Sequence, residues 1–483
     1  MIKKLQEKYK ALPVQVKASL WFLICSVLQK GISVLTTPIF SRLMSTEQYG
    51  DYNVFNSWEN VLAVFVTMRL YYGVYTQGLI KFNEIRDKFS SALQGLTLTM
   101  TGIWTIVYII GHNFWNGLLD MSTSAMAAMF VTIWATAVFK FWAAEQRTKY
   151  QYVKLVIVSI AVSLMKPALG ITLVMMTEDK TLARIWAFAI VELIGYGWLF
   201  YVQMRKGKVF FSKKIWLYAL RFNIPLIPHY LSQTVLSSSD RIMIKKMVDS
   251  SSSGIYSLSY QISMLMLLFT EALQQTLAPW IYQKIKDRNF KRVDKIVYTS
   301  LALVALANMM LIIIAPEAVA IFAPKSYHDA IWIIPPVAMS TFFIFLYNVF
   351  SFFEFYFEKS KLIAISTMGA AIANVLLNYI FISKFGYYAA GYTTLVCYIL
   401  YAILHFLVMR SICKNEFNNS RILNPFVLLI IAVIFMVCGF TVMLLYRVIW
   451  IRYVIILALL IGAFLMRDKL ITFYKMLRKR TDS

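Results

Sequence analysis

Long apolar segments alternate with short polar connections along nearly the whole chain. Each segment has the length of a membrane-spanning helix, which needs roughly 17 to 25 residues. The pattern predicts an all-α polytopic membrane protein with about fourteen transmembrane helices. The expected spans are residues 17–44, 50–78, 90–111, 122–144, 153–176, 182–203, 215–247, 253–280, 293–315, 331–356, 362–383, 388–410, 424–446 and 451–467.

The seventh span, residues 215–247, differs from the others because it carries polar side chains at depth. At about 100° per residue, His229, Gln233, Ser237 and Asp240 fall on one face of the helix. An ionisable side chain at the centre of a bilayer costs roughly 2.5 to 3.5 kcal/mol on insertion scales. A helix surrounded only by lipid would gain nothing from such a stripe, so we expect the stripe to face water or a polar cargo.

The first span repeats this pattern. An offset of about 199 residues places Lys30 against His229 and Arg42 against Arg241, as expected for an internal repeat. The first twelve spans divide into six and six at a basic connection, and six spans return the chain to the same side of the membrane. We therefore predict two lobes related by a pseudo-twofold axis along the membrane normal. The predicted divisions are 1–203 for helices 1–6, 204–412 for helices 7–12, and 413–483 for helices 13–14 with a basic cytoplasmic tail.

Composition agrees with a membrane protein. Of the 483 residues 60% are hydrophobic, and the mean hydropathy is +0.65, which is too apolar for a soluble chain of this size. The net charge of +25 lies between the apolar segments rather than in one patch, so we expect no nucleic-acid partner. Lys and Arg concentrate in alternate connections, and the positive-inside rule then places both termini in the cytoplasm.

A second group of charges lies within the spans. The basic members outnumber the acidic ones, so the interior is expected to be net cationic and to suit an anionic cargo such as a pyrophosphate. Lys140 and Lys166 lie near span ends or beside a proline, and we interpret them as snorkelling or structurally paired. The predicted cargo-binding residues are Lys30, Arg42, Arg69, Arg221, His229 and Arg241.

Carboxylates within the spans raise the question of ion coupling. Glu59, Asp240 and Glu271 are the candidates, because a buried carboxylate can take up a proton or help to hold Na⁺. An internal ion pair with one of the cations is the alternative role. Asn374 and Asn378 lie in a segment rich in small residues, which favours close helix packing.

Motifs for chemistry do not occur in the sequence. The chain has no phosphate-cradling glycine-rich loop with Lys, no H-E-x-x-H and no nucleophile elbow. We expect no enzymatic activity and no cofactor beyond a coupling ion, H⁺ or Na⁺.

Two segments resemble a known family. GISVLTTPIFSRLMSTEQYGDYNVFNS (31–57) and IPLIPHYLSQTVLSSSDRIMIKKMVDSSSSGIYSLSY (224–260) are similar to the polysaccharide-transporter, or Wzx-type oligosaccharide flippase, branch of the multidrug/oligosaccharidyl-lipid/polysaccharide (MOP) exporter superfamily. The resemblance implies that an undecaprenyl-pyrophosphate-linked repeat unit of an O-antigen or capsule moves across the bacterial cytoplasmic membrane. It also implies alternating access of two lobes, an ion gradient as the driving force, and an association of the last two spans with the lipid tail.

The resemblance also implies where the cationic residues lie. In related lipid-linked-precursor flippases the first, second and eighth helices carry them. Lys30, Arg42 and Arg69 occupy the first two places here, whereas the eighth span offers Glu271 and no Arg. We expect a monomer in contact with membrane lipids, a polysaccharide polymerase and glycosyltransferases. A multidrug antiporter of the same superfamily and a membrane-embedded polymerase or ligase remain the alternatives.

Overall fold

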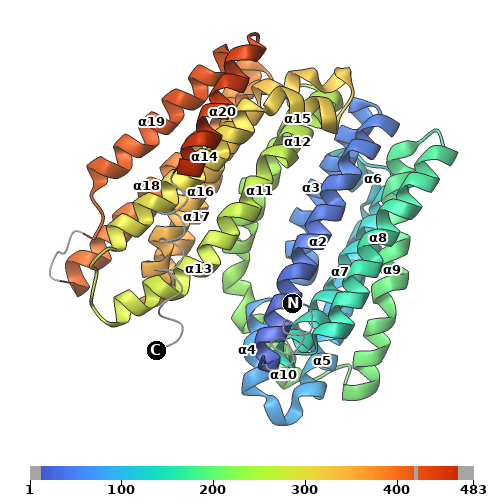
Figure 1. Ribbon diagram of the computed structural model, residues 1–483. Coiled ribbons are helices and arrows are strands. Elements are labelled where there is room, and N and C mark those ends of the chain that lie inside the picture. Colours follow the sequence, from blue (N-terminus) through green and yellow to red (C-terminus); the bar gives the residue numbers. More distant parts are fainter. Residues whose placement is uncertain (1–11, 418–421, 466–483) are drawn as a thin grey trace, which may run out of the picture. The chain divides into compact units, whose positions relative to one another are not determined.

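Helices account for the regular structure in the computed structural model, which describes residues 12–417 and 422–465 (Figure 1). No strand occurs within these ranges, so the predicted all-α class is confirmed. The basic tail lies outside the described residues. The first half contains α2 (Val14–Leu43), α3 (Thr46–Thr67), α4 (Gly73–Lys81), η1 (Asn83–Ile85), α5 (Arg86–Ile110), α6 (His112–Leu119), α7 (Thr123–Thr148), α8 (Tyr152–Met176), α9 (Lys180–Gly207), α10 (Lys213–Asn223), η2 (Ile224–Leu226) and α11 (Ile227–Met247). The second half contains α12 (Ser250–Met264), α13 (Met266–Lys286), α14 (Val293–Ile313), α15 (Ala315–Phe322), η3 (Lys325–Trp332), α16 (Ile334–Tyr356), α17 (Ser360–Phe385), α18 (Tyr388–Glu416), α19 (Pro425–Leu444) and α20 (Ile449–Leu465).

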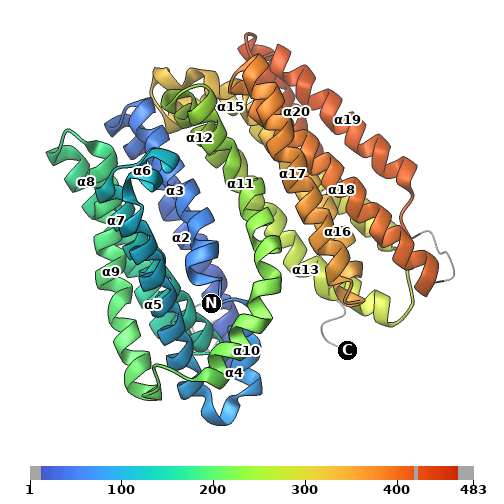
Figure 2. The same ribbon diagram turned by 180° about the vertical axis from the view of Figure 1, so that it is seen from behind.

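Two compact units make up the chain, and each is described by itself. Unit 1 is Met1–Thr234 and unit 2 is Val235–Ser483, so the division falls within α11. In unit 1, α9 packs against α5, α7 and α8, and α2 packs on α8. In unit 2, α16 is the central helix and packs against α12, α13, α14 and α18. Figure 2 shows α16 beside α17 and α18. The lobe boundaries expected from the sequence, at 203/204 and 412/413, stay a prediction.

The predicted spans correspond to helices, but some are interrupted. Ten helices of the described residues are long and apolar enough to cross a membrane by length and composition. The other four predicted segments are more polar, broken or short. Residues 50–78 form α3 and α4, 215–247 form α10, η2 and α11, 253–280 form α12 and α13, and 451–467 correspond to α20.

The interruptions have identifiable local causes. In the second predicted span, Met68 and Arg69 take positive φ angles of 48° and 46°, which a right-handed helix cannot contain. In the seventh, Pro225 lacks a backbone donor and its ring disfavours a continuous helix, so the chain passes through η2 before α11 begins. The more polar spans are therefore also the ones that bend.

The first and seventh spans, which repeat each other, contain α2 and α11. The helices that follow them, α3 and α12, begin in the same way. Ser45 precedes α3, and its hydroxyl accepts a hydrogen bond of 3.1 Å from the backbone N–H of Gln48, whose side chain bonds back in a capping box. Asp249 precedes α12 and accepts from the N–H of Ser252 at 2.6 Å. Both caps satisfy backbone donors that a helix start leaves open.

A glycine in α5 permits a close approach to the chain between α9 and α10. A Cβ built on Gly95 would lie 2.1 Å from the carbonyl oxygen of Phe210, whereas one on Gly102 of the same helix meets nothing within 4 Å. We therefore expect Gly95→Ala to lower the unfolding temperature of the detergent-purified protein by several degrees. Gly102→Ala is the matched control and should be neutral or stabilising by about 0.5 to 1 kcal/mol, because alanine favours a helix. Equal behaviour of the two variants would contradict the close contact.

Candidate functional site

Arg69 stands at the break between α3 and α4 of unit 1. Two consecutive non-glycine residues in the left-handed region are uncommon and cost energy. Side chains support this turn. Asn223, which is fully buried, donates from Nδ2 to the carbonyl oxygen of Met68 at 2.6 Å, and Thr67 Oγ1 accepts from the N–H of Arg69 at 3.2 Å. The turn is therefore held in place by groups that take over the hydrogen bonds lost from the helix.

The guanidinium of Arg69 is oriented by the start of α11. Its Nη2 donates to Thr234 Oγ1 at 2.8 Å, and its Cζ lies 5.7 Å from the centre of the Tyr230 ring. Its Nε is buried and has no hydrogen-bond partner among the described residues. A guanidinium that is positioned and still has a free donor is suited to an anion, since phosphate and carboxylate accept paired hydrogen bonds from its fork.

His229 lies beside this arrangement. Its ring packs at 6.0 Å from the ring of Tyr230, the residue that Arg69 covers. The side chain is partly buried, and its Nδ1 has no hydrogen-bond partner in residues 12–417 and 422–465. Arg69 and His229, predicted from separate spans, are therefore both brought to Tyr230.

The other predicted cations of unit 1 are not joined to Arg69 by any contact of the described residues. Lys30 is partly buried on α2. Arg42 is exposed, and its Nη1 donates to the carbonyl oxygen of Pro38 at 3.0 Å. Arg221 is exposed on α10. These three remain predicted cargo-binding residues.

A polar cavity of about 250 Å³ lies between α3, α7, α8 and α9 of unit 1. Glu59 of α3 lines it, opposite the ion pair of Lys166 and Glu192. Thr136 Oγ1 also donates to Glu192, at 2.9 Å. Lys166 thus has the internal pairing expected from the sequence, and Glu59 is the carboxylate of this cavity that no described residue hydrogen-bonds.

Two further cations of unit 1 lie against aromatic rings. Lys140 Nζ lies 4.6 Å above the ring of Tyr71. Arg184 was not predicted. It is 8% exposed, and its Cζ lies 3.8 Å from the ring centre of Phe40 and 3.7 Å from that of Tyr52. Cation–π contacts of this kind stabilise a desolvated charge. Arg184 opens the span after a short acidic connection, so its sequence position alone is typical of an interfacial residue.

Asp240 is the centre of a buried polar cluster in unit 2. Its carboxylate is 1% exposed and accepts from the Tyr256 hydroxyl at 2.6 Å, from Asn378 Nδ2 at 2.5 Å and from Thr394 Oγ1 at 3.1 Å. Asn374 joins the cluster by accepting from Asn378 at 3.3 Å, and its own Nδ2 has no partner among the described residues. The polar stripe had suggested that Asp240 faces water or a polar cargo. In the structure its carboxylate instead points into the interior of unit 2.

The remaining predicted residues of unit 2 do not join this cluster through a hydrogen bond of the described residues. Arg241 donates from Nη1 to the carbonyl oxygen of Ser237 at 2.9 Å, and its Cζ lies 4.3 Å from the ring centre of Tyr260. Glu271 is exposed on α13.

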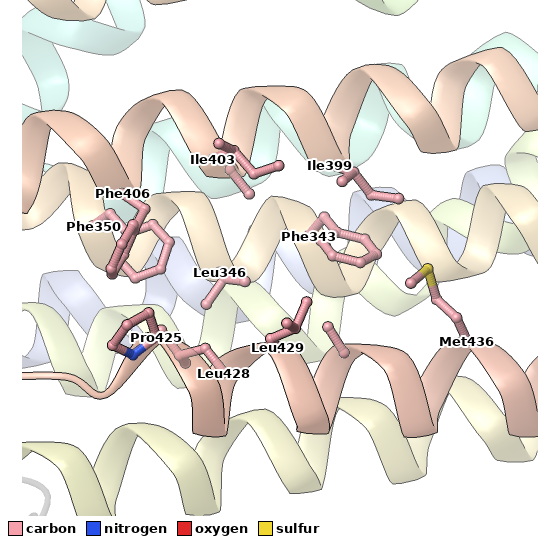
Figure 3. A pocket seen from close by; sticks show the side chains of 12 residues that line it. Phe343, Leu346, Phe350, Ile399, Ile403, Phe406, Pro425, Leu428, Leu429 and Met436 are labelled. Atoms are coloured by element: carbon pink, nitrogen blue, oxygen red, sulfur yellow. The ribbon is translucent and has the colours of Figure 1, made fainter.

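An apolar groove of about 180 Å³ opens between α16, α18 and α19 of unit 2 (Figure 3). Its walls are aliphatic and aromatic side chains without a charged group. The lining residues are Phe343, Leu346, Phe350, Ile399, Ala402, Ile403, Phe406, Pro425, Leu428, Leu429, Ala432 and Met436. Such a groove suits a hydrocarbon chain.

A family model described as polysaccharide biosynthesis protein matches residues 16–285, which is more than half of the chain and includes both repeated helix pairs. The chain belongs to this family. A second model, MatE, matches residues 225–380. The two matches together assign the chain to the polysaccharide-transporter type of the MOP exporter superfamily, as the resemblance of the two segments indicated.

Two curated relatives are distant in sequence from this chain. An uncharacterized membrane protein of Haemophilus influenzae is 22% identical over 360 residues, which cover 72% of this chain and 85% of the relative. The Lsg locus putative protein 1 of the same organism is 26% identical over 155 residues, 30% of this chain and 37% of the relative. The first match extends over most of both proteins.

Solved structures show the same fold. The lipid II flippase MurJ in an inward closed conformation has a TM-score of 0.70 at 14% identity and covers 93% of this chain and 99% of its own. An inward-facing multidrug resistance MATE family transporter has a TM-score of 0.63 at 13% identity, with 80% and 96% covered. At these identities the likeness concerns the fold alone.

The cavity of unit 1 predicts different roles for its two carboxylates. We expect Glu192→Gln to lower the free energy of unfolding by about 3 kcal/mol, because removing one partner of a buried pair leaves the other charge uncompensated. Glu59→Gln should change it by less than about 0.5 kcal/mol, since no described hydrogen bond is lost. Chemical unfolding of the purified protein followed by tryptophan fluorescence measures both. Equal losses would show that Glu59 shares in holding Lys166.

Proposed function

We propose that this protein is a flippase that moves an undecaprenyl-pyrophosphate-linked oligosaccharide repeat unit across the cytoplasmic membrane by alternating access. Membership of the polysaccharide biosynthesis family supports the cargo class. The fold supports transport without a covalent step, because the family fold is that of membrane exporters and flippases. In this proposal the protein is a monomer and both of its termini are cytoplasmic. Glycosyltransferases act on the cargo before it is moved, and a polymerase acts on it afterwards.

Arg69 is the observation that carries the proposal. Its guanidinium is fixed by Thr234 and Tyr230, yet Nε keeps a free donor. A buried donor without a partner is costly, and an anionic group supplied by a cargo would satisfy it. A pyrophosphate offers several acceptor oxygens at this position, and His229 adds a second nitrogen beside the same tyrosine. Lys30, Arg42, Arg221 and Arg241 complete the proposed cationic set.

The polyprenyl chain is the second part of the cargo, and the groove between α16, α18 and α19 is a suitable place for it (Figure 3). The groove offers only apolar side chains, and each buried CH₂ contributes about 0.8 kcal/mol. One of its walls is α19, which belongs to the pair of last helices associated with the lipid tail in the family resemblance.

Ion coupling is proposed to act through the buried carboxylates. Asp240 brings one carboxylate together with amide and hydroxyl oxygens, which are hard ligands of the kind Na⁺ accepts. Glu59 and Glu271 are the further proposed coupling residues. H⁺ is the alternative ion at each of them.

A multidrug antiporter is the second candidate, because the MatE model matches residues 225–380. A cationic drug would be repelled by the free guanidinium donor of Arg69. Efflux of ethidium from proteoliposomes with no movement of lipid-linked sugar would favour this candidate over the flippase.

Arg69 gives the first test of the flippase. In proteoliposomes that contain undecaprenyl-pyrophosphoryl N-acetylglucosamine, we expect Arg69→Ala to reduce translocation roughly 10- to 100-fold, since a hydrogen bond to a charged group contributes about 1.5 to 3 kcal/mol. Enzymatic labelling of the sugar from outside measures its movement. Arg205→Ala removes an exposed Arg from the end of α9 and is the matched control. Wild-type translocation by Arg69→Ala, in protein with unchanged unfolding, would exclude Arg69 from the site.

Asp240 gives the test of coupling. We expect Asp240→Asn to abolish stimulation of the same translocation by an imposed Na⁺ or pH gradient, because the neutral amide neither binds a proton nor attracts a cation strongly. Asp294→Asn, at an exposed position of α14, should leave the stimulation unchanged. The two gradients are imposed separately, so that the result identifies the ion. Full stimulation of Asp240→Asn by both gradients would refute the assignment.

A further inference from the structure

The polar cavity of unit 1 has an aromatic end and a polar end. The residues of α3 that line it share one face of the helix, at spacings of three and four: Tyr52, Phe55, Asn56, Glu59 and Asn60. The two aromatic residues come first along α3, and the three polar residues follow. The direction of α3 therefore orders the wall of the cavity.

α9 contributes to the cavity in the same order. Its start lies beside the start of α3, where Thr181 Oγ1 donates to the carbonyl oxygen of Gln48 at 3.2 Å. Ile185 and Phe188 line the cavity earlier in α9 than Glu192 does. The apolar residues of both helices therefore gather toward one end of the cavity and the polar residues toward the other.

Three polar side chains that line the cavity form no hydrogen bond with any described residue. They are Asn56 and Glu59 of α3 and Thr132 of α7. Thr132 is 7% exposed, and a threonine in a helix commonly donates to the carbonyl four residues earlier, as Thr101 does at 2.8 Å. Unlike single unpartnered atoms elsewhere in the chain, these groups surround one space. Water or a ligand within that space would bond to all of them.

The aromatic end offers a surface for an apolar face. Phe55 is 4% exposed and packs on no other aromatic ring of the described residues. Beside it, the rings of Tyr52 and Phe188 meet edge to face at 5.9 Å. A sugar ring has the two kinds of surface that this cavity has, because its C–H groups pack on aromatic rings and its hydroxyl groups donate and accept hydrogen bonds.

The size of the cavity limits the ligand. Its volume is about 250 Å³, which is the space of several waters at about 30 Å³ each in the liquid. Pockets for drug-sized ligands run from roughly 300 to 1,000 Å³. Asn60 lines the cavity and is exposed, so the cavity opens to the surface of the unit there. The space suits one sugar ring rather than a whole oligosaccharide.

The walls disfavour a charged ligand. The ammonium group of Lys166 lies on the wall and opposes a metal cation. Within the described residues, no group of three or more His, Cys, Asp or Glu could hold a metal ion. The carboxyl groups of Glu59 and Glu192 oppose an anion, and Lys166 and Glu192 already pair with each other. An uncharged ligand with several hydroxyl groups fits best.

We propose that this cavity binds one uncharged sugar ring of the lipid-linked cargo. Asn56, Glu59 and Thr132 form hydrogen bonds with its hydroxyl groups, and Phe55 packs on its C–H face. The sugar displaces water, and no covalent bond changes. This inference rests on the proposed function for the origin of the sugar. Because Glu59 is also a proposed coupling residue, the tests leave it unchanged.

Arg69 follows the end of the same helix. Asn60 precedes Thr67, the last residue of α3, by roughly 10 Å at 1.5 Å per residue, and Arg69 stands in the turn that follows. The cargo carries its sugars on the pyrophosphate. The pyrophosphate proposed for Arg69 and a sugar in the cavity would thus both be bound along α3.

Sugar binding can be measured without transport. The full-length protein is purified in a detergent without a sugar head group and studied by saturation-transfer difference NMR. The probes are glucose, galactose, rhamnose, N-acetylglucosamine and N-acetylgalactosamine. We expect saturation transfer to at least one of these sugars in the wild type. Asn56→Leu/Thr132→Val should bind that sugar at least tenfold more weakly, because two hydrogen bonds are lost while the side-chain sizes are nearly kept.

The matched control is Asn113→Leu/Thr99→Val. Asn113 is exposed on α6, Thr99 is half-buried on α5, and neither lines the cavity. This control should bind the sugar as the wild type does. Asn56→Leu alone serves if the double variant does not fold, which circular dichroism of the purified proteins shows.

A second measurement connects the cavity with transport. Proteoliposomes receive an undecaprenyl-pyrophosphate-linked trisaccharide that contains the sugar bound most tightly in the NMR measurement. At a low concentration of this cargo, we expect the double variant to move it at least fivefold more slowly than the wild type and the control do. A higher concentration should restore the rate, because the variant weakens binding of the cargo and leaves the movement of the helices intact.

The outcomes are distinct. Absence of saturation transfer to all five sugars in the wild type overturns the proposal, as does equal affinity in the double variant. Stabilisation of the wild type by Na⁺ and not by sugar, lost in the double variant, would make the cavity an ion site and also overturns it. Lost sugar binding with wild-type translocation would exclude the cavity from transport. If the wild type moves no lipid-linked sugar, the proposed function fails, while the NMR measurement still decides whether the cavity binds a sugar.

Discussion

Hydrocarbon offers no hydrogen-bond partner, and this constraint governs where the polar groups of the chain lie. Every donor or acceptor placed in a membrane-spanning helix must be satisfied by protein, by water or by a ligand, or it costs several kcal/mol. In unit 1 the break at Met68 and Arg69 is tolerated because Asn223 supplies the hydrogen bond that the helix gives up. In unit 2 the buried carboxylate of Asp240 is tolerated because three neutral donors surround it. The polar residues are thus built into each unit.

Buried polar atoms without a hydrogen-bond partner among the described residues occur in structural groups as well as in candidate functional ones, for example the Nε of Arg184 and of Arg452 as well as that of Arg69. The pair of Lys166 and Glu192 is closed by its own contacts and by Thr136. The Nε of Arg69, in contrast, is buried and has no hydrogen-bond partner among the described residues. A transporter needs groups whose best partner is present in only one state, because a ligand shifts a conformational equilibrium only by its difference in affinity for the two states. Unsatisfied buried atoms are where such differences can arise.

Much of the architecture could be predicted from the sequence, and the reason is physical. Apolar length identifies the spans, and the periodicity of polar residues set the seventh apart from the others. The two left-handed residues at Met68 and Arg69 could not be predicted, because neither is glycine and the turn depends on Asn223 from a distant helix.

The candidate sites were predictable only in part. Asp240 and Arg69 were identified as charges at depth, and His229 by its place on the polar stripe, since a single helix is enough to show these. Their partners could not be identified in this way. Asn374 and Asn378 follow a spacing that favours helix packing, and only the folded arrangement brings them to Asp240. The contacts of Arg184 with Phe40 and Tyr52 likewise join residues far apart in sequence, and a one-dimensional pattern carries no information on such contacts.

Helix α11 contributes side chains to both candidate sites. Its first turns belong to unit 1, where Thr234 holds Arg69, and the turns that follow belong to unit 2, where Asp240 holds the helix to α12, α17 and α18. The cargo group proposed for Arg69 and the ion proposed for Asp240 are therefore each held with the help of a side chain of α11, Thr234 in the first case and Asp240 itself in the second.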